Sequence, residues 1–135
     1  MPDRMTDAPT VRPRLSVVIP MYEECENVSP MLERVHEGLD GYHGAWELIC
    51  VDDGSRDGTG TRLRDEAERY GSHVRVIELR RNFGQTAAMQ AGLDAARGEL
   101  VATLDGDLQN DPADIPRMVA ELMDRDLDLL QGYVD

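Results

Sequence analysis

Short apolar runs alternate along this sequence with longer segments that carry apolar residues at helical spacing. Runs rich in Val, Ile and Leu, as buried strands are, cover 15–20, 47–51, 74–79, 100–104 and 127–134. In the segments between them apolar residues recur every three or four positions, which is typical of amphipathic helices. Strands that alternate with helices predict an α/β fold, with a mainly parallel sheet and helices on both of its faces.

Capping and turn residues mark the expected helix ends. Ser29–Pro30 is expected to open the first helix, because serine caps helices and proline suits the first helical position. Asp57 or Thr59 is expected to cap the second helix. The other expected boundaries are Gly41 and Gly44 after the first helix, Gly71 after the second, Gln85–Arg97 closed by Gly98 for the third, and Asp111–Pro112 opening the fourth.

The domain organisation follows from length and composition. Residues 1–13 contain three prolines and no apolar period, so we expect a flexible N-terminal tail. Residues 14–135 have the size of one domain. The sequence stops within or just after its fifth expected strand, and a parallel sheet normally covers its last strand. We therefore expect the domain to be incomplete at its C-terminus.

The charge balance excludes several classes of function. The chain has 14 basic and 27 acidic residues, a net charge of −13, so nucleic-acid binding is excluded for lack of basic clusters. All 14 basic residues are arginine. The absence of lysine argues against a P-loop, a Schiff-base enzyme, an aspartyl-phosphate phosphatase and a two-component receiver domain. No signal peptide and no apolar stretch of about 20 residues is present, which predicts a cytoplasmic chain.

Polar residues follow the expected strands at the point where each strand ends. In an open parallel sheet the carboxyl ends of the strands lie at one edge, where ligands bind. We therefore expect the clusters Tyr22–Asn27, Asp52–Asp57, Arg80–Gly84 and Asp105–Asp111 to meet at that edge.

The segment L-D-G-D-L-Q at 104–109 carries the strongest sign of chemistry. Asp105 and Asp107 lie two residues apart, so in an extended chain both carboxylates point to one side. Gly106 lets a ligand approach, and Gln109 adds a neutral oxygen. Such a sparse set of oxygens suits Mg²⁺ or Mn²⁺, which keeps waters and takes further ligands from a phosphate. A simple polar turn is the alternative.

Two further segments have a binding interpretation beside a structural one. V-D-D-G-S-R-D-G-T at 51–59 places Asp53 where its carboxylate could accept hydrogen bonds from ribose hydroxyls or a base N–H; a capping loop is the alternative. R-R-N-F-G-Q at 80–85 places Arg80 and Arg81 before a helix start, a combination that favours an anion. Solvated arginines are the alternative there.

The order of these motifs resembles the family-two inverting glycosyltransferases with a GT-A fold. V-V-I-P-M-Y-E-E at 17–24 comes first, then V-D-D-G-S-R-D-G-T, R-N-F-G-Q and L-D-G-D-L-Q-N-D-P. Within that family the chain looks most like the polyprenyl-phosphate group that includes dolichol-phosphate mannose synthase. The resemblance implies a Rossmann-like, GT-A nucleotide-binding half over residues 15–132.

The resemblance also implies roles for individual residues. It assigns metal binding to Asp107 with help from Asp105 and Gln109, and it makes Asp105 and Asp107 the catalytic pair. Arg81 is added to the nucleotide-sugar site from its place before the third helix. The remaining residues that the resemblance assigns to that site are Pro20, Tyr22, Glu24, Val51, Asp53, Asp105 and Gly106.

The implied reaction is the metal-dependent, inverting transfer of a sugar from a nucleoside diphosphate to a polyprenyl phosphate. The sequence departs from the family at Glu23, where asparagine is usual, and it lacks the family's acceptor-side elements. The alternatives are a truncated module that binds a sugar nucleotide without transferring it, and transfer to a saccharide.

The missing elements lead to expectations for this chain made alone. We expect it to bind sugar nucleotide poorly, to self-associate through the strand at 127–134, and to transfer nothing. In the intact protein, contact with the cytoplasmic face of a membrane is expected through the missing part only.

Overall fold

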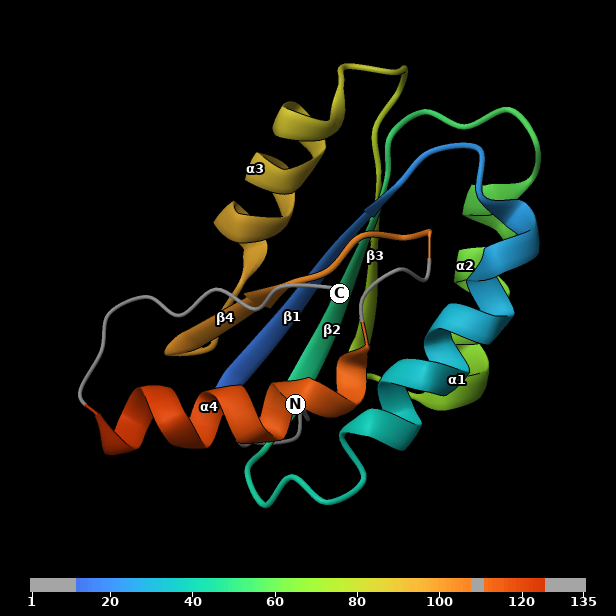
Figure 1. Cartoon of the computed structure of the whole chain (residues 1–135). Helices are drawn as coiled ribbons and strands as arrows, with labels where there is room; N and C mark the ends of the chain where they lie inside the picture. The colour runs from blue at the N-terminus through green and yellow to red at the C-terminus, as the bar shows by residue number, and fades with distance from the viewer. Residues whose placement is uncertain (1–11, 108–110, 126–135) are drawn as a thin grey trace, which may run out of the picture.

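A parallel sheet with strand order β3-β2-β1-β4 forms the centre of the computed structural model, which describes residues 12–107 and 111–125 (Figure 1). The strands are β1 (Leu15–Met21), β2 (Trp46–Asp52), β3 (Val74–Glu78) and β4 (Leu100–Thr103). The order places β1 between β2 and β4, so the chain turns from one side of β1 to the other after β3. The predicted α/β fold is therefore confirmed.

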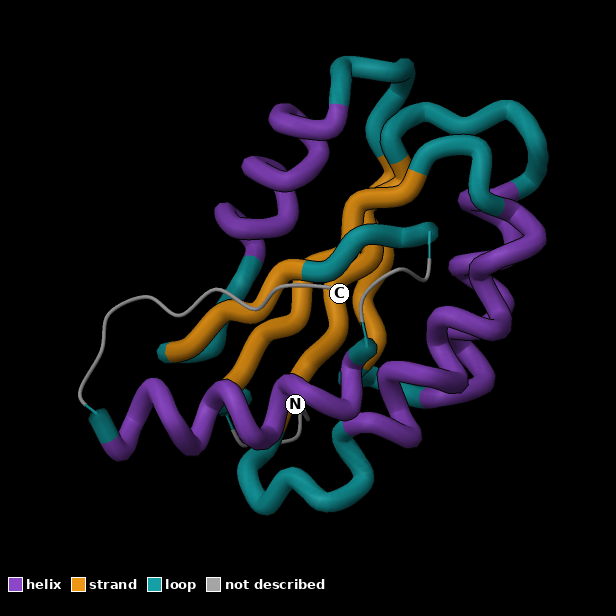
Figure 2. The backbone as a smooth tube through the Cα atoms, in the orientation of Figure 1, coloured by secondary structure: helices purple, strands orange, loops and turns teal. Residues whose placement is uncertain are grey.

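Helices cover both faces of the sheet, as predicted (Figure 2). They are α1 (Val28–Gly38), α2 (Thr59–Tyr70), α3 (Gln85–Ala95) and α4 (Ile115–Asp124), with short 3-10 turns at Cys25–Asn27 and Pro112–Asp114. Alternate residues of β1 divide the core. Val17 and Ile19 face α1 and α2, together with Ile115 at the start of α4. Val18 faces α3 and packs with its buried Ala88.

The four strands of the described residues lie within one or two residues of their predicted positions, but several helix ends differ. Helix α1 begins at Val28, and the Ser29 hydroxyl donates to Glu66 instead of capping the helix. Helix α1 ends at Gly38, before Gly41, and α3 ends at Ala95. The Ser29 prediction was wrong because its hydroxyl bonds to Glu66. Helix α3 ends early where the N–H groups of Arg97 and Gly98 donate to Glu47 and Ser16.

Other predicted boundaries are confirmed. Gly71 ends α2 with φ of 124°, and its N–H donates to the Ala67 carbonyl. Asp111 accepts a hydrogen bond from the Ala113 N–H before α4. The predicted cap of α2 at Asp57 or Thr59, by contrast, is wrong: the N-cap residue is Gly58, no side chain caps the helix, and Asp57 accepts from the Thr59 N–H just before it.

The described residues include little of the predicted tail and none of the predicted fifth strand. Of the predicted tail, only residues 12 and 13 are described, and Pro13 is buried. Arg14 already pairs with the sheet region, since its N–H donates to the Ala45 carbonyl at 2.8 Å. The predicted strand at 127–134 lies outside the described residues. In the described part of the chain, no helix combines the length and apolar character needed to cross a membrane.

Candidate functional site

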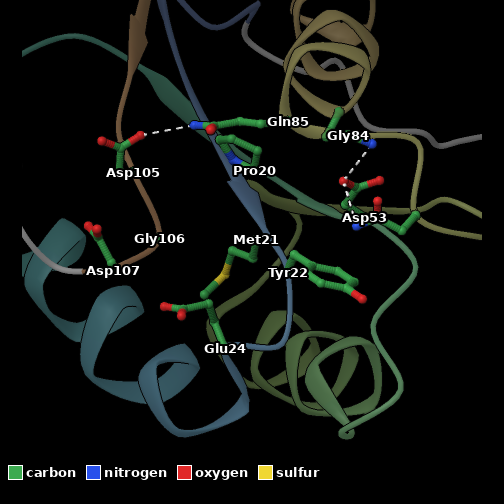
Figure 3. A pocket seen from close by; sticks show the side chains of 12 residues that line it. Pro20, Met21, Tyr22, Glu24, Asp53, Gly84, Gln85, Asp105, Gly106 and Asp107 are labelled. Atoms are coloured by element: carbon green, nitrogen blue, oxygen red, sulfur yellow. Dashed lines mark hydrogen bonds between the residues drawn. The ribbon is translucent and has the colours of Figure 1, made fainter.

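A cavity of about 390 Å³ opens at the carboxyl ends of the strands, within the size range of small-molecule sites. Figure 3 shows its walls: Asp105 and Asp107 on one side, Asp53 and Gly84 on the other, and the end of β1 between them. The described residues that line it are Pro20, Met21, Tyr22, Glu24, Asp53, Asn82, Gly84, Gln85, Ala88, Asp105, Gly106 and Asp107.

Most of the residues singled out in the sequence meet in this cavity. Those that line it are Pro20, Tyr22, Glu24, Asp53, Asp105, Gly106 and Asp107. The Val51 side chain does not, because it is fully buried beside Ala88 between the sheet and α3. Arg81 lies outside the lining as well, with its guanidinium carbon 4.8 Å from the centre of the Phe83 ring. Gln109 lies outside the described residues.

The loop that follows β1 is held by the loop that follows β2. Glu23 has φ of 54°, and its N–H donates to Ser55 Oγ at 2.8 Å. The next N–H, of Glu24, donates to Thr59 Oγ1 at 3.0 Å. The Cys25 N–H donates to Asp57 Oδ2 at 3.1 Å. The polar residues at 55–59 therefore shape the segment that presents Tyr22 and Glu24 to the cavity.

Asp57 shows the electrostatic result of this arrangement. Desolvation raises the pKa of its carboxyl, but hydrogen bonds from the Thr59 hydroxyl and from the N–H groups of Cys25 and Thr59 outweigh that effect. The net result is a lowered pKa, so Asp57 stays ionised as an acceptor for both loops. The sequence indicated a capping role for Asp57 or Thr59, whereas in the structure Asp57 links this loop to the first motif through the Cys25 N–H.

Asp53 binds donors that belong to the chain itself. It is 2% exposed, and its carboxylate accepts hydrogen bonds from the Phe83 N–H at 2.8 Å and the Gly84 N–H at 3.1 Å. The Asn82 amide adds a third bond at 3.3 Å. Asp53 therefore fixes the loop between β3 and α3, in addition to lining the cavity.

Gly54 makes this approach of the two loops possible. Its φ is 73°, in the left-handed region that side chains disfavour. A Cβ at Gly54 would lie 2.2 Å from the Arg81 carbonyl carbon and 2.5 Å from the Asn82 nitrogen. The glycine in V-D-D-G is thus required by backbone packing against residues 81 and 82.

The two acids after β4 lie on either side of a buried glycine. Asp105 and Asp107 are exposed, whereas a Cβ on Gly106 would lie 2.9 Å from Met21 Cγ. The glycine lets this segment cross the end of β1 at close range. Gln85, the first residue of α3, donates from Nε2 to Asp105 Oδ1 at 3.3 Å.

The carboxylate oxygens after β4 suit a hard divalent cation. Asp105 and Asp107 offer carboxylate oxygens, which suit Mg²⁺ or Mn²⁺. Within 12–107 and 111–125, no group of three or more His, Cys, Asp or Glu side chains is arranged to hold a metal ion. Two carboxylates alone fit an ion that takes its remaining ligands from water and phosphate.

Several lining residues were not assigned to the site from the sequence. They are Met21, Asn82, Gly84, Gln85 and Ala88. Asn82 and Gly84 fall in the polar cluster after β3, so their position at a strand end was the available signal. Gln85 and Ala88 belong to α3, and only the fold shows that this helix begins at the cavity.

Residues 16–135 match the family described as "Glycosyl transferase family 2". The chain belongs to this family. It is 54% identical over 132 residues to the dodecaprenyl-phosphate galacturonate synthase of Rhizobium johnstonii, covering 98% of this chain and 39% of that enzyme. It is 43% identical over 126 residues to the undecaprenyl-phosphate 4-deoxy-4-formamido-L-arabinose transferase of Edwardsiella ictaluri, covering 93% of this chain and 38% of the transferase. The chain therefore spans about two fifths of the length of these relatives.

Solved structures show the same fold. The mannosyltransferase PcManGT from Pyrobaculum calidifontis, in complex with GDP-Man and Mn²⁺, superposes with a TM-score of 0.72 at 29% identity. The match covers 84% of this chain and 33% of that one. S. aureus TarS 1-349 superposes with a TM-score of 0.63 at 22% identity, covering 83% of this chain and 32% of its own. The GT-A fold implied by the motifs is thereby confirmed.

Proposed function

We propose that this chain is the nucleotide-sugar-binding part of an inverting glycosyltransferase that uses Mg²⁺ or Mn²⁺ and transfers a sugar to polyprenyl phosphate. The observation that carries the proposal is the cavity at the carboxyl edge of the sheet, with Asp105 and Asp107 on one side of the end of β1 and Asp53 on the other (Figure 3). The names of the two relatives support a polyprenyl-phosphate acceptor. The Mn²⁺ and GDP-Man bound to PcManGT support the cation and the donor class.

The charge of the cavity wall supports the cation independently. The acidic lining residues are Glu24, Asp53, Asp105 and Asp107, and none of the described lining residues is basic. A diphosphate entering such a wall is repelled unless positive charge enters with it. Asp107 and Asp105 would hold the divalent ion, with Gln109 as a further oxygen ligand. A bound divalent cation neutralises the charge that develops on the leaving diphosphate.

The chain's own groups then bind and orient the donor. Tyr22, Glu24 and Asp53, with Pro20 at the end of β1, surround the space for the nucleoside. The acceptor attacks the anomeric carbon from the face opposite the diphosphate, which inverts that carbon. A phosphate acceptor is largely ionised at neutral pH, since its second pKa is about 6. The reaction therefore requires no strong general base from this chain.

The acceptor also suggests where the intact protein works. A polyprenyl phosphate is held in a membrane, so the intact protein would act at the cytoplasmic face of that membrane. Self-association stays a prediction from the sequence.

Titration calorimetry on the intact protein tests the cation and the donor. We expect Mn²⁺ and a nucleoside diphosphate, with GDP and UDP as probes, to raise each other's affinity. Asp107→Ala should lose that mutual enhancement at least tenfold. Asp124→Ala, an exposed acid at the end of α4, is the matched control and should keep it. If Asp107→Ala retains the enhancement of the parent, the cation site is wrongly placed.

A transfer assay tests the acceptor. The intact protein, a radiolabelled nucleoside-diphosphate sugar, Mn²⁺ and a short polyprenyl phosphate should give labelled lipid. Tight nucleotide binding without transfer to either a lipid phosphate or a saccharide would establish the binding module instead. Transfer to a saccharide alone would replace the acceptor class.

A further inference from the structure

We infer that the segment 82–85 couples the nucleotide side of the cavity to its metal side, and that Gln85 is the positioning residue that orients the carboxylate of Asp105. This inference rests on the proposed function, because it concerns how the proposed cation site is held. It adds Gln85 and the loop before it to the residues on which cation binding depends.

The first link of the coupling lies on the nucleotide side. Asp53 is 2% exposed and accepts hydrogen bonds from the N–H groups of Phe83 and Gly84, at 2.8 and 3.1 Å. Gly54, just after β2, lies in close contact with the backbone of Arg81 and Asn82 in the same loop. The loop that follows β3 is therefore held at the end of β2 both by hydrogen bonds to the Asp53 carboxylate and by close backbone packing at Gly54.

The second link is the start of α3. Gly84 has φ of 104° and precedes the helix, and its carbonyl accepts from the Ala88 N–H at 3.0 Å. The helix is packed on the sheet through Ala88, which is fully buried, and through Gly92, where a Cβ would lie 2.3 Å from Val18 Cγ1. The first residue of the helix, Gln85, therefore has little freedom of backbone position.

The third link crosses the cavity. The Gln85 amide donates to Asp105 Oδ1 at 3.3 Å, as the dashed line in Figure 3 shows. A donor on one oxygen restrains the rotation of the carboxylate and so the direction of its second oxygen. Because the amide is neutral, it does this without adding positive charge that would compete with a cation. Groups that orient metal ligands in this way commonly change metal affinity by 10- to 100-fold when they are removed.

The chain contains a matched control on the same helix. Gln90 donates from Nε2 to Asp94 Oδ1 at 2.8 Å, on an exposed part of α3 away from the cavity lining. Gln85→Met and Gln90→Met each replace an amide by an apolar side chain of similar length, and each removes one bond from glutamine to aspartate. Only the first removes it from a proposed metal ligand.

The experiment measures Mn²⁺ binding to the intact protein by electron paramagnetic resonance, with and without GDP or UDP. We expect Gln85→Met to weaken Mn²⁺ binding in the presence of nucleotide about tenfold and to alter the spectrum of the bound ion. Nucleotide affinity in EDTA and the thermal midpoint should stay at the parent values. Gln90→Met should match the parent in all these measurements.

The other outcomes distinguish a failure of the positioning role of Gln85 from a failure of the proposed function. Parental Mn²⁺ affinity in Gln85→Met overturns the inference and leaves the proposed function standing. Equal weakening in both variants also overturns it, because the effect would then belong to the helix as a whole. Loss of nucleotide affinity in EDTA would show that Gln85 contacts the nucleotide directly, which overturns its positioning role. If the parent shows no coupling between Mn²⁺ and either nucleotide, the proposed function itself fails.

Discussion

The two ends of the sheet hold their acidic residues differently. At the amino ends of the strands, Glu47 is 1% exposed and accepts hydrogen bonds from Ser16, Arg75 and Arg97. At the carboxyl ends, four acidic residues line the cavity, and none of its described lining residues is basic. The two arginines lie 2.8 and 2.9 Å from Glu47. Burial raises the pKa of Glu47, but these donors and the Arg97 N–H outweigh burial and lower the pKa to about 2.

The comparison separates two uses of acidic residues in one sheet. At the amino ends the chain supplies its own positive charge, so the acid stabilises the fold. At the carboxyl ends acids are gathered around a space that a ligand can enter. We therefore expect substitutions at Glu47 to change stability, and substitutions at the exposed Asp105 and Asp107 to change binding.

The largest expected effect is on Glu47. Glu47→Ala leaves Arg75 and Arg97 without their shared acid and should lower the free energy of unfolding by about 3 kcal/mol. Urea denaturation followed by circular dichroism measures it. Asp107→Asn, at the exposed cavity end, should change stability by less than about 0.5 kcal/mol. Equal losses in the two variants would contradict the division between the ends.

Gly54 tests how closely the two loops must approach at the cavity. Gly54→Ala should lower the free energy of unfolding by about 2 kcal/mol, because a Cβ there meets the backbone of residues 81 and 82 and φ is 73°. It should also weaken nucleotide binding. Gly41→Ala is the control, since a Cβ at Gly41 meets nothing within 4 Å, and it should leave both quantities near the parent values. A fully stable Gly54→Ala variant would show that the loops separate without cost.

A pair of histidines, His36 and His73, is expected to make the stability of the fold depend on pH. His36 Nδ1 lies 2.7 Å from the Leu32 carbonyl and its Nε2 lies 2.8 Å from His73 Nε2, beside Trp46 and Tyr70. Burial, and then the charge of His36, lower the pKa of His73. The unfolded chain therefore binds more protons, so the stability due to His73 is complete above pH about 6.5 and is lost as the pH falls below it.

Thermal midpoints measured from pH 7.5 to 5 check this expectation. The loss of stability between pH 7.5 and 5 should be smaller than the loss caused by Gly54→Ala. In His73→Gln the thermal midpoint should change less with pH. The pKa of Glu47 is lowered too, to about 2 from 4.5, so its contribution is also lost on acidification, but at lower pH. That contribution persists across this range and is lost only as the pH falls from about 4.5 through about 2. An unchanged slope in His73→Gln would exclude the histidine pair as the cause.

A small effect is also expected at Glu23, in the loop after β1. Its φ of 54° favours asparagine over glutamate, but its carboxylate accepts a hydrogen bond from the Arg56 N–H at 2.6 Å. Glu23→Asn introduces a residue that tolerates this φ better but loses the hydrogen bond from the Arg56 N–H. It should therefore change the free energy of unfolding by less than about 1 kcal/mol. Scanning calorimetry would detect a larger change, which would show that one of the two effects dominates.

The sequence predicted the strands and the edge at which the motifs meet because both depend on local patterns. Val17, Val18 and Ile19 could belong only to a buried strand, and Asp53 and Asp105 follow strands directly. Strand order was beyond local patterns: nothing near Leu100 indicates that β4 pairs with β1. The start of α1 was missed because Ser29 forms a tertiary bond to Glu66 in place of a cap.

The site was predictable in its acids but not in the direction of every side chain. Val51 and Asp53 are close in sequence, yet Val51 points into the layer beneath α3 while Asp53 lines the cavity. Arg81 could have reached an anion, but it stacks on Phe83. Gln85 looked like an ordinary helical residue, and only the packing of α3 brings it to Asp105. The role of each residue in binding stays a prediction.

The pairing of Leu15 with Leu100 has a consequence for how the protein is made. During synthesis β1 can pair with β2 after about 30 further residues, but its other edge stays open until β4 has been translated. Parallel pairing over such a separation forms late, because a long loop must close first. The nascent chain thus assembles the Asp53 side of the cavity before the Asp105 side, and the apolar edge of β1 is the surface that a chaperone would need to shield in the interval.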